Sequence, residues 1–189
     1  MAQLQPGNPI FRLADQGDID GIIKIHNLNV FTTQSSHEKG FLLMPVTAEI
    51  IAQNRAKSMQ YFVAARDTEI LGFTLVAPLT LTQDYTAPLY WTNPAILEKT
   101  REAPERHIFI SLVAIHPQFM VQGVGHFLYQ SLFSEFSDYY FSAFVVNKPV
   151  KNQRSINFHL KQGFTLAATM QREQFLYFKD YESWLFFRI

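Results

Sequence analysis

The segment Met120-Val-Gln-Gly-Val-Gly125 joins two stretches whose patterns indicate different secondary structure. Before it, Ile108-Phe-Ile-Ser-Leu-Val-Ala-Ile115 is a continuous apolar run typical of a buried strand. After it, apolar side chains recur at helical spacing, at Val124, Phe127, Leu128, Leu132 and Phe136. A glycine-bearing turn from a strand into a helix leaves backbone N–H groups unpaired at the positive end of the helix dipole. This pattern predicts a binding site for a phosphate group.

The glycine spacing alone leaves a second interpretation open. Two glycines one residue apart also occur in ordinary tight turns, where glycine supplies a positive φ. No lysine follows Gly125, so the segment is not a Walker loop, and the third glycine of the dinucleotide-binding fingerprint is missing. Nucleotide hydrolysis and hydride transfer are therefore disfavoured.

The composition favours one globular domain spanning residues 1–189. The chain is 48% hydrophobic and 17% charged, which is enough apolar material for a full core. With 16 basic and 16 acidic residues and no basic run, nucleic acid is not an expected partner. The absence of cysteine excludes disulfides and cysteine-ligated metal, and we expect no metal site. No signal peptide or 18-residue apolar run is visible, so we expect a cytoplasmic protein without a membrane partner.

Strand and helix patterns alternate along the chain and predict a mixed α/β fold. The expected strands are residues 10–14, 61–65, 69–76, 108–115, 141–146, 164–170 and 184–188. The expected helices begin at Asp18, near Thr47, at Val124 and after Asn152. Gly163 is expected to end the last of them. Four helices and seven strands are thus predicted.

Periodicity is lost in residues 78–106, which hold three prolines at Pro88, Pro94 and Pro104. The same segment carries three large aromatic side chains, at Tyr85, Tyr90 and Trp91. We expect an irregular insertion there, serving either as a lid on the substrate side or as a plain surface loop.

Two motifs in the second half resemble those of the GNAT superfamily of acyl-CoA-dependent N-acyltransferases. Gln122-Gly-Val-Gly125 follows Ala114-Ile-His-Pro117, and Asn152-Gln-Arg-Ser-Ile-Asn-Phe-His-Leu-Lys-Gln-Gly-Phe164 resembles the family's Asn-x-x-Ala segment ending in Gly-Phe. The resemblance covers nearly the whole chain. It implies a single domain with a central mixed, mostly antiparallel sheet, splayed in the middle and flanked by about four helices. It also implies transfer of an acetyl group from acetyl-CoA to a primary amine of a small molecule or peptide, by direct attack in a ternary complex.

The resemblance further implies where acetyl-CoA binds. The pantetheine arm is expected beside the strand end at Val113, Ala114 and Ile115. The pyrophosphate is expected at Met120, Val121, Gln122, Gly123, Val124, Gly125 and His126. Met120 stands where the family has Gln or Arg, so we expect weaker cofactor affinity rather than none. Asn152 and Ser155 are expected to face the cofactor, although helix capping alone would also explain Asn152.

His159 occupies the position at which the family commonly has a tyrosine that protonates the departing thiolate. A neutral imidazole can still donate one N–H, so His159 is the candidate general acid. The alternative is a packing or hydrogen-bonding histidine. If His159 is the acid, alanine in its place should lower turnover more than about tenfold.

The sequence does not identify the general base. Relatives often place a glutamate where this chain has Ser111 or Asn147, and neither is a useful base. The remaining candidates are His107, His116, Glu102, Glu105 or an ordered water.

Two other classes of function are kept as alternatives. The departures at Met120, Ser111 and Asn147 are compatible with a catalytically weak acyl-CoA-binding or sensing domain. The 18 phenylalanines and the aromatic C-terminal part are compatible with an interaction module, or with a homodimer interface. The acceptor is not identified by the sequence.

Overall fold

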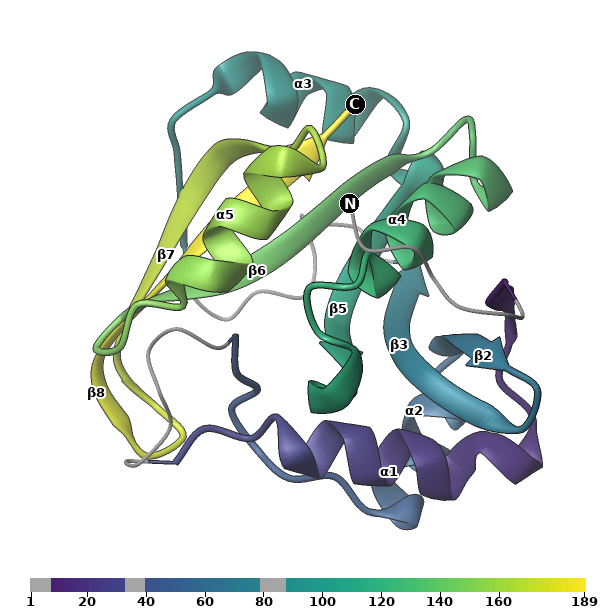
Figure 1. Cartoon of the computed structure of the whole chain (residues 1–189). Coiled ribbons are helices and arrows are strands. Elements are labelled where there is room, and N and C mark those ends of the chain that lie inside the picture. Colours follow the sequence, from purple (N-terminus) through teal and green to yellow (C-terminus); the bar gives the residue numbers. More distant parts are fainter. Residues whose placement is uncertain (1–7, 33–39, 79–87) are drawn as a thin grey trace. The chain divides into compact units, whose positions relative to one another are not determined.

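The computed structural model describes residues 8–32, 40–78 and 88–189 (Figure 1). Its eight strands are hydrogen-bonded in the order β1-β2-β3-β5-β6-β8-β7-β4. Strands β5 and β6 run parallel, whereas the pairs β1–β2, β2–β3, β4–β7, β6–β8 and β7–β8 run antiparallel. The predicted mixed, mostly antiparallel α/β fold is therefore confirmed. The chain divides into two compact units, which are described separately.

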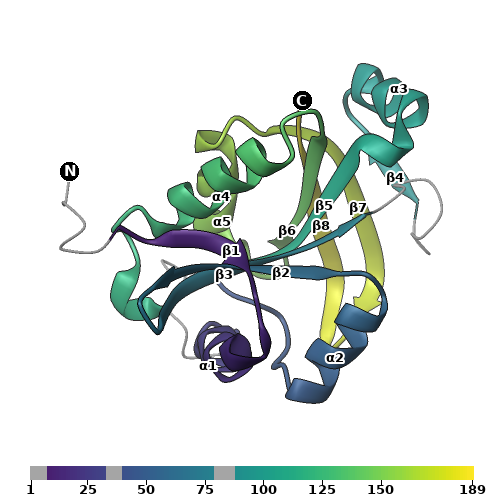
Figure 2. The ribbon, with the colours of Figure 1, turned by 90° about the vertical axis from the view of Figure 1, so that its right-hand side faces the viewer.

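The first unit comprises residues 1–33, 41–77 and 111–137. Its elements are β1 (Ile10–Leu13), α1 (Ile19–Leu28), α2 (Ala48–Ala56), β2 (Gln60–Arg66), β3 (Glu69–Pro78), the last part of β5 (His107–Ile115) and α4 (Val124–Glu135). Helices α1 and α2 cover one face of β1, β2 and β3, and α4 covers the other (Figure 2). The first face is buried by α1 side chains such as Ile22 against Val63 and Phe73, and the second by Val124 and Leu128 against Ala64.

Most elements of this unit agree with the sequence predictions. Thr47 caps α2 by accepting a hydrogen bond from the N–H of Ile50, and β2 and β3 form the expected hairpin. Asp18 is the exception. It precedes α1 without making a side-chain cap, and its carboxylate accepts hydrogen bonds from the guanidinium of Arg12 and the N–H of Asp15. The hydrogen bond from Arg12 is the main reason that the pKa of Asp18 is lowered.

The second unit comprises residues 34–40, 78–110 and 138–189. Its elements are β4 (Leu89–Trp91), α3 (Pro94–Glu102), the first part of β5, β6 (Tyr140–Lys148), α5 (Gln153–Lys161), β7 (Thr165–Phe175) and β8 (Phe178–Arg188). Strand β5 pairs with β6 at His107–Phe109 and Tyr140–Ser142. On β8, Phe186 contacts His159 of α5, whereas Leu185 and Phe187 pack with Ile96 of α3, so the two helices lie on opposite faces. The expected splay between β5 and β6 stays a prediction.

The segment 78–106 is not irregular in its described part, so that expectation was wrong there. Residues 89–91 form β4, which pairs with β7, and 94–102 form α3, which buries Ile96 and Thr100. Pro94 was interpreted as a loop signal, but it lies in the first turn of α3. Proline is accepted there because a backbone N–H at that position would have no partner within the helix. Tyr85 lies outside the described residues.

Strands β7 and β8 are longer than predicted and meet in a tight hairpin. They pair from Thr165–Phe187 to Phe175–Phe178, and Leu176 in the turn has a positive φ of 55°. The aromatic residues noted in the sequence gather at this end, where the rings of Phe175 and Tyr181 lie 4.6 Å apart. The predicted strands 164–170 and 184–188 were too short because polar residues, some of them exposed, interrupt the apolar pattern on which the prediction rested.

Gly72 in β3 is required by its close approach to the end of β5. A Cβ added to Gly72 would lie 2.7 Å from Cδ1 of Ile115 and 2.9 Å from the carbonyl oxygen of Ala114. We predict that Gly72→Ala lowers the free energy of unfolding by about 1–3 kcal/mol, because the added methyl group overpacks this contact. Urea unfolding measures the effect. Gly40→Ala is the matched control, since its Cβ would meet only Oδ1 of Asn152, at 3.6 Å. Equal stability of the two variants would contradict the prediction.

Candidate functional site

The chain passes from β5 into α4 through a short 3-10 turn and two residues of positive φ. The 3-10 turn η3 spans Pro117–Phe119, and Phe119 is buried in the core of the first unit. Val121 then has φ 61° and is 88% exposed, and Gly123, at the N-cap of α4, has φ 88°. Positive φ at both positions turns the backbone sharply outward. The predicted strand, glycine turn and helix are therefore present in this order.

This turn presents unpaired backbone donors. In the described part of the chain, the N–H groups of Val121, Gly123, Val124 and Gly125 form no hydrogen bond, whereas that of Phe127 bonds to the carbonyl oxygen of Gly123. Helix α4 has 12 residues and no acidic side chain in its first turn. Its dipole therefore adds positive potential at the same place. The backbone is arranged to bind an anionic group such as a pyrophosphate.

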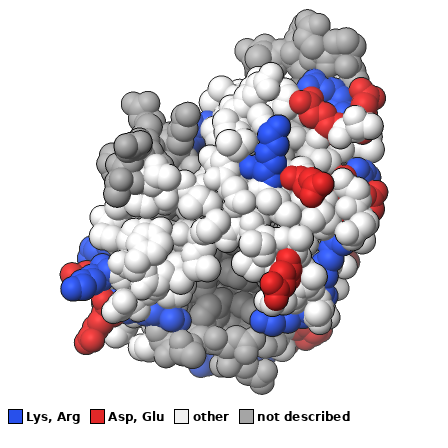
Figure 3. Space-filling view, turned by 90° about the horizontal axis from the view of Figure 1, so that it is seen from below, with Lys and Arg blue, Asp and Glu red and all other residues white. Residues whose placement is uncertain are grey.

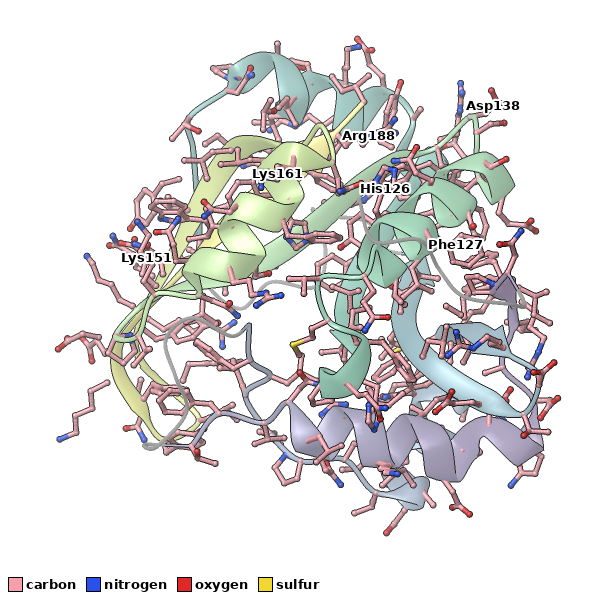
Figure 4. All side chains as sticks on the ribbon, viewed as in Figure 1. His126, Phe127, Asp138, Lys151, Lys161 and Arg188 are labelled. Atoms are coloured by element: carbon pink, nitrogen blue, oxygen red, sulfur yellow. The ribbon has the colours of Figure 1, made fainter. Side chains whose placement is uncertain are left out.

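Side chains contribute little polarity to the turn. Met120 is half-buried and supplies no donor, while Gln122 is exposed and its side chain bonds to the carbonyl oxygen of Gln118 at 2.9 Å. His126 is exposed on the first turn of α4, and the neighbouring Phe127 packs toward the core (Figure 4). Binding at this turn would therefore depend mainly on the backbone.

The end of β5, where the pantetheine arm is expected, is held firmly by its neighbours within the first unit. Nδ2 of Asn29 donates to the carbonyl oxygen of Ile115 at 3.1 Å, and the N–H of His116 donates to that of Leu71 at 2.9 Å. Ala114 is buried, and Val113 packs toward Leu128 of α4. Asn29 was missed in the sequence because an asparagine after a helix usually acts as a C-cap, and only the fold brings it to β5.

Helix α5 carries the second set of predicted residues, in the other unit. Oδ1 of Asn152 accepts a hydrogen bond from the N–H of Ser155 at 3.3 Å, which confirms the predicted N-cap. The N–H of Asn152 donates to the carbonyl oxygen of Val146, so the start of α5 is tied to β6. Gly163, with φ 86°, follows the helix as predicted. The cofactor contacts of Asn152 and Ser155 stay predictions.

His159 lies in an aromatic environment and is only 2% exposed. Its ring stacks 5.8 Å from that of Phe186 and meets that of Phe164 edge-on at 5.3 Å. Nδ1 lies 2.8 Å from the carbonyl oxygen of Ser155, and because a carbonyl can only accept, Nδ1 carries the proton. Burial lowers the pKa of His159 to about 4. The neutral ring thus spends its one N–H inside α5, which favours the packing alternative over a general acid.

The candidates for the general base are distributed over both units. His107 is 2% exposed, and its Nε2 lies 2.7 Å from Oγ of Ser142. Nδ1 of His116 accepts a weak hydrogen bond from the N–H of Gln118 at 3.3 Å and so caps the 3-10 turn η3. Glu102 and Glu105 are exposed at the end of α3 and in the following 3-10 turn η2 (Pro104–Arg106).

The family model of the acetyltransferase (GNAT) family matches residues 24–164 of this chain. The chain belongs to the GNAT family. Acetyl-CoA, the co-substrate expected from the resemblance, is the co-substrate of that family. A search of curated proteins found no match.

Solved structures of acetyltransferases share the fold. An N-acetyltransferase from Staphylococcus aureus has 16% identity and a TM-score of 0.64, covering 95% of this chain and 97% of that one. A ribosomal-protein-alanine N-acetyltransferase from Brucella melitensis has 16% identity and a TM-score of 0.64, covering 95% and 99%. A Salmonella typhimurium protein solved with its cofactor acetyl-CoA has 16% identity and a TM-score of 0.62, covering 95% and 92%.

The described part of this GNAT chain was also searched for membrane-spanning helices and metal-binding groups. Among residues 8–32, 40–78 and 88–189, no helix is long and apolar enough to cross a membrane. Within the same ranges, no group of three or more His, Asp or Glu side chains is placed to hold a metal ion.

Restoring a basic side chain at position 120 should strengthen acetyl-CoA binding. Met120→Arg would add a charged donor beside the free N–H groups, and we predict a Kd about fivefold lower, equivalent to about 1 kcal/mol. Isothermal titration calorimetry measures it. Gln118→Arg, on the exposed surface of η3, controls for the added charge alone. An unchanged Kd for Met120→Arg, or an equal gain for Gln118→Arg, would argue against this position facing the phosphates.

Burial of His159 should make stability depend on pH. The unfolded chain protonates this histidine near its ordinary pKa of 6.5, whereas the folded protein does so only near about 4. Between these values the unfolded state binds more protons, so stability falls as pH drops from about 6.5 to about 4. We predict that wild type loses up to roughly 3 kcal/mol more than His159→Phe over this range.

Urea unfolding at a series of pH values measures the difference. His126→Phe replaces an exposed histidine and serves as the control. His26 is also buried, with a lowered pKa, but it is present in both proteins and cancels in the comparison. Parallel pH profiles for wild type and His159→Phe would show that His159 titrates normally.

Proposed function

We propose that this protein is an N-acetyltransferase that moves an acetyl group from acetyl-CoA to a primary amine in a ternary complex. The observation that carries the proposal is the set of unpaired N–H groups at Val121, Gly123, Val124 and Gly125. They occur at the glycine motif of the family, where the resemblance places the pyrophosphate. We further propose that the protein is soluble and cytoplasmic and that its partners are acetyl-CoA and an amine.

The reaction requires three events at the thioester. The lone pair of the neutral amine attacks the acetyl carbon, the C–S bond breaks, and the nitrogen loses a proton while the thiolate of coenzyme A gains one. The chain must therefore hold the two reactants together and exclude competing water. A thiol of ordinary pKa, about 8.5, is a tolerable leaving group, so a weak donor or a water suffices to protonate it.

The role of His159 decides how the thiolate is protonated. As general acid it would need a free N–H, but its Nδ1–H bonds to Ser155 within α5. We predict that His159→Phe, which keeps the aromatic packing, retains turnover within about threefold at saturating acetyl-CoA. A loss above about tenfold in a folded variant would reinstate His159 as the acid.

A thermal shift followed by a thiol-release assay tests the proposed function. Acetyl-CoA that binds only the folded state should raise Tm by mass action, and an acceptor amine should then release free coenzyme A. A shift without thiol release over a wide amine panel would favour the acyl-CoA sensor. No shift at millimolar acetyl-CoA would contradict the enzyme and favour the interaction module, whose candidate surface includes Tyr177, 59% exposed at the β7–β8 turn. Dimerisation through such a surface would be seen by analytical ultracentrifugation.

The acceptor panel should be broad. On the face shown in Figure 3, basic and acidic side chains are interspersed without a patch of one sign, and the net charge is zero. Electrostatic steering of a highly charged acceptor is therefore not expected. Small amines, amino acids, aminoglycosides and peptide N-termini are the classes to compare.

A further inference from the structure

A pocket of about 270 Å³ lies within the first unit, where the end of β1 meets the end of α2 and the start of β2. It is on the face of the strands that α1 and α2 cover, whereas α4 covers the other face (Figure 2). Its lining consists of Leu13, Ala14, Arg55, Met59, Gln60 and Tyr61. The pocket is therefore separate from the turn before α4, at which we propose that the pyrophosphate binds.

Arg55, in the last turn of α2, supplies the positive charge of the pocket. Its Nη2 donates to the carbonyl oxygens of Ala14 at 3.1 Å and Asp15 at 3.2 Å. Carbonyl oxygens are neutral, so these bonds orient the guanidinium without cancelling its charge. Among the residues that the structure describes, Nε and Nη1 of Arg55 have no hydrogen-bond partner and no carboxylate forms an ion pair with it. The N–H groups on these two nitrogens can therefore bind an acceptor from outside the chain.

Asp18 is the nearby carboxylate on which the charge of Arg55 acts, but Asp18 is already paired. Its two oxygens accept hydrogen bonds from both Nη atoms of Arg12, and one of them also accepts the N–H of Asp15. The hydrogen bond from Arg12 contributes most to lowering the pKa of Asp18, and the charge of Arg55 contributes least. Asp18 therefore does not take the place of a ligand at Arg55.

Tyr61 supplies a second donor to the pocket. The residue is 2% exposed, and its hydroxyl oxygen accepts a hydrogen bond from Nδ2 of Asn54 in α2 at 2.8 Å. Burial raises the pKa of Tyr61, so the hydroxyl keeps its proton at neutral pH. That proton has no acceptor within the described ranges of the chain. Because a buried donor without an acceptor is costly, an acceptor atom in the pocket would stabilise this group.

The two donor groups are held near one another by the backbone around them. The charge of Arg55 acts on the pKa of Tyr61 in the direction opposite to that of burial, so the guanidinium and the hydroxyl are close. The N–H of Ala14 donates to the carbonyl oxygen of Tyr61 at 2.8 Å, and the N–H of Met59 donates to that of Asn54 at 3.1 Å. The pocket is thus formed before any ligand binds, and binding requires little ordering of the chain.

The remaining lining defines the rest of the ligand. Leu13 is 54% exposed and Met59 is half-buried, so the pocket has an apolar wall beside its donors. Covering this wall with an aliphatic chain would remove apolar surface from water. A single guanidinium with a neighbouring hydroxyl suits one planar carboxylate, whose two oxygens accept from the guanidinium fork. The volume suits a ligand smaller than a typical drug.

We propose that this pocket binds a small aliphatic monocarboxylate. Its carboxylate accepts hydrogen bonds from Arg55 and Tyr61, and its chain packs against Leu13 and Met59. The proposal goes beyond the acetyltransferase function and does not rest on it.

A titration of the full-length chain with 4-methylpentanoate, followed in nitrogen-15 NMR spectra, tests the proposal. We expect saturable binding with a Kd of about 1 mM, a value ordinary for so small a ligand. The amide resonances of Ala14, Asp15 and Tyr61 should shift, because they belong to the walls of the pocket. The neutral compound 4-methylpentanamide has the same shape without the charge, and it should bind at least about tenfold more weakly.

Two variants separate the contributions of the donors. Arg55→Gln removes the charge and should weaken binding of 4-methylpentanoate at least about tenfold. Tyr61→Phe removes the hydroxyl and keeps the ring, and a loss of about three- to tenfold is expected. Lys57→Gln removes an exposed cation two residues from Arg55 and is the matched control, for which the Kd should not change.

Several outcomes would overturn the proposal. They are the absence of saturable binding to wild type, equal affinity for the neutral amide, and an unchanged Kd for Arg55→Gln. Shifts confined to residues 121–125 would place the carboxylate at the turn before α4 instead, and tighter binding of inorganic phosphate at the pocket would assign it to another class of anion. If Arg55→Gln does not fold, Tyr61→Phe decides, and an unchanged Kd then refutes the contact. Acetyl-CoA takes no part in these titrations, so their failure would leave the proposed acetyltransferase function untouched.

Discussion

Unpaired backbone N–H groups at the start of α4 are the constraint on which the proposed function of this protein depends. They exist because β5 ends in a turn whose φ values at Val121 and Gly123 are positive, so the chain enters the helix without pairing its first donors. Gly72 lets β3 approach the end of β5, and Asn29 binds the last carbonyl of that strand, so the turn starts from a fixed point. The core of the first unit therefore holds in place the backbone that we propose to bind the pyrophosphate.

Because the donors belong to the backbone, the departure of the chain from its family at Met120 is tolerable. A side chain at that position can add affinity, but the N–H groups are supplied by any residue type that can adopt the turn. In the second unit, the side chain predicted to act as general acid differs from expectation. His159 is packed among Phe164 and Phe186, and its Nδ1–H is bonded to the carbonyl oxygen of Ser155.

Local signals in the sequence predicted much of this architecture. Thr47, Asn152 and Gly163 act as helix caps or stops because capping depends on the residues within one turn of the chain. Pro94 was misinterpreted because proline marks both loops and the first turn of helices. The pocket beside Arg55 could not have been found in the sequence. Its walls come from β1, α2 and β2, and their meeting depends on how the helix packs on the strands, which is a property of the folded chain.

The most direct test of the central claim is a titration with acetyl-CoA followed by amide chemical shifts in nitrogen-15 NMR spectra. If the turn binds the pyrophosphate, the amide resonances of Val121, Gly123, Val124 and Gly125 should show the largest changes in the first unit. They should move downfield, since each N–H gains a charged acceptor. Saturable binding of acetyl-CoA that leaves these four resonances in place would contradict the account, whatever the rest of the spectrum does.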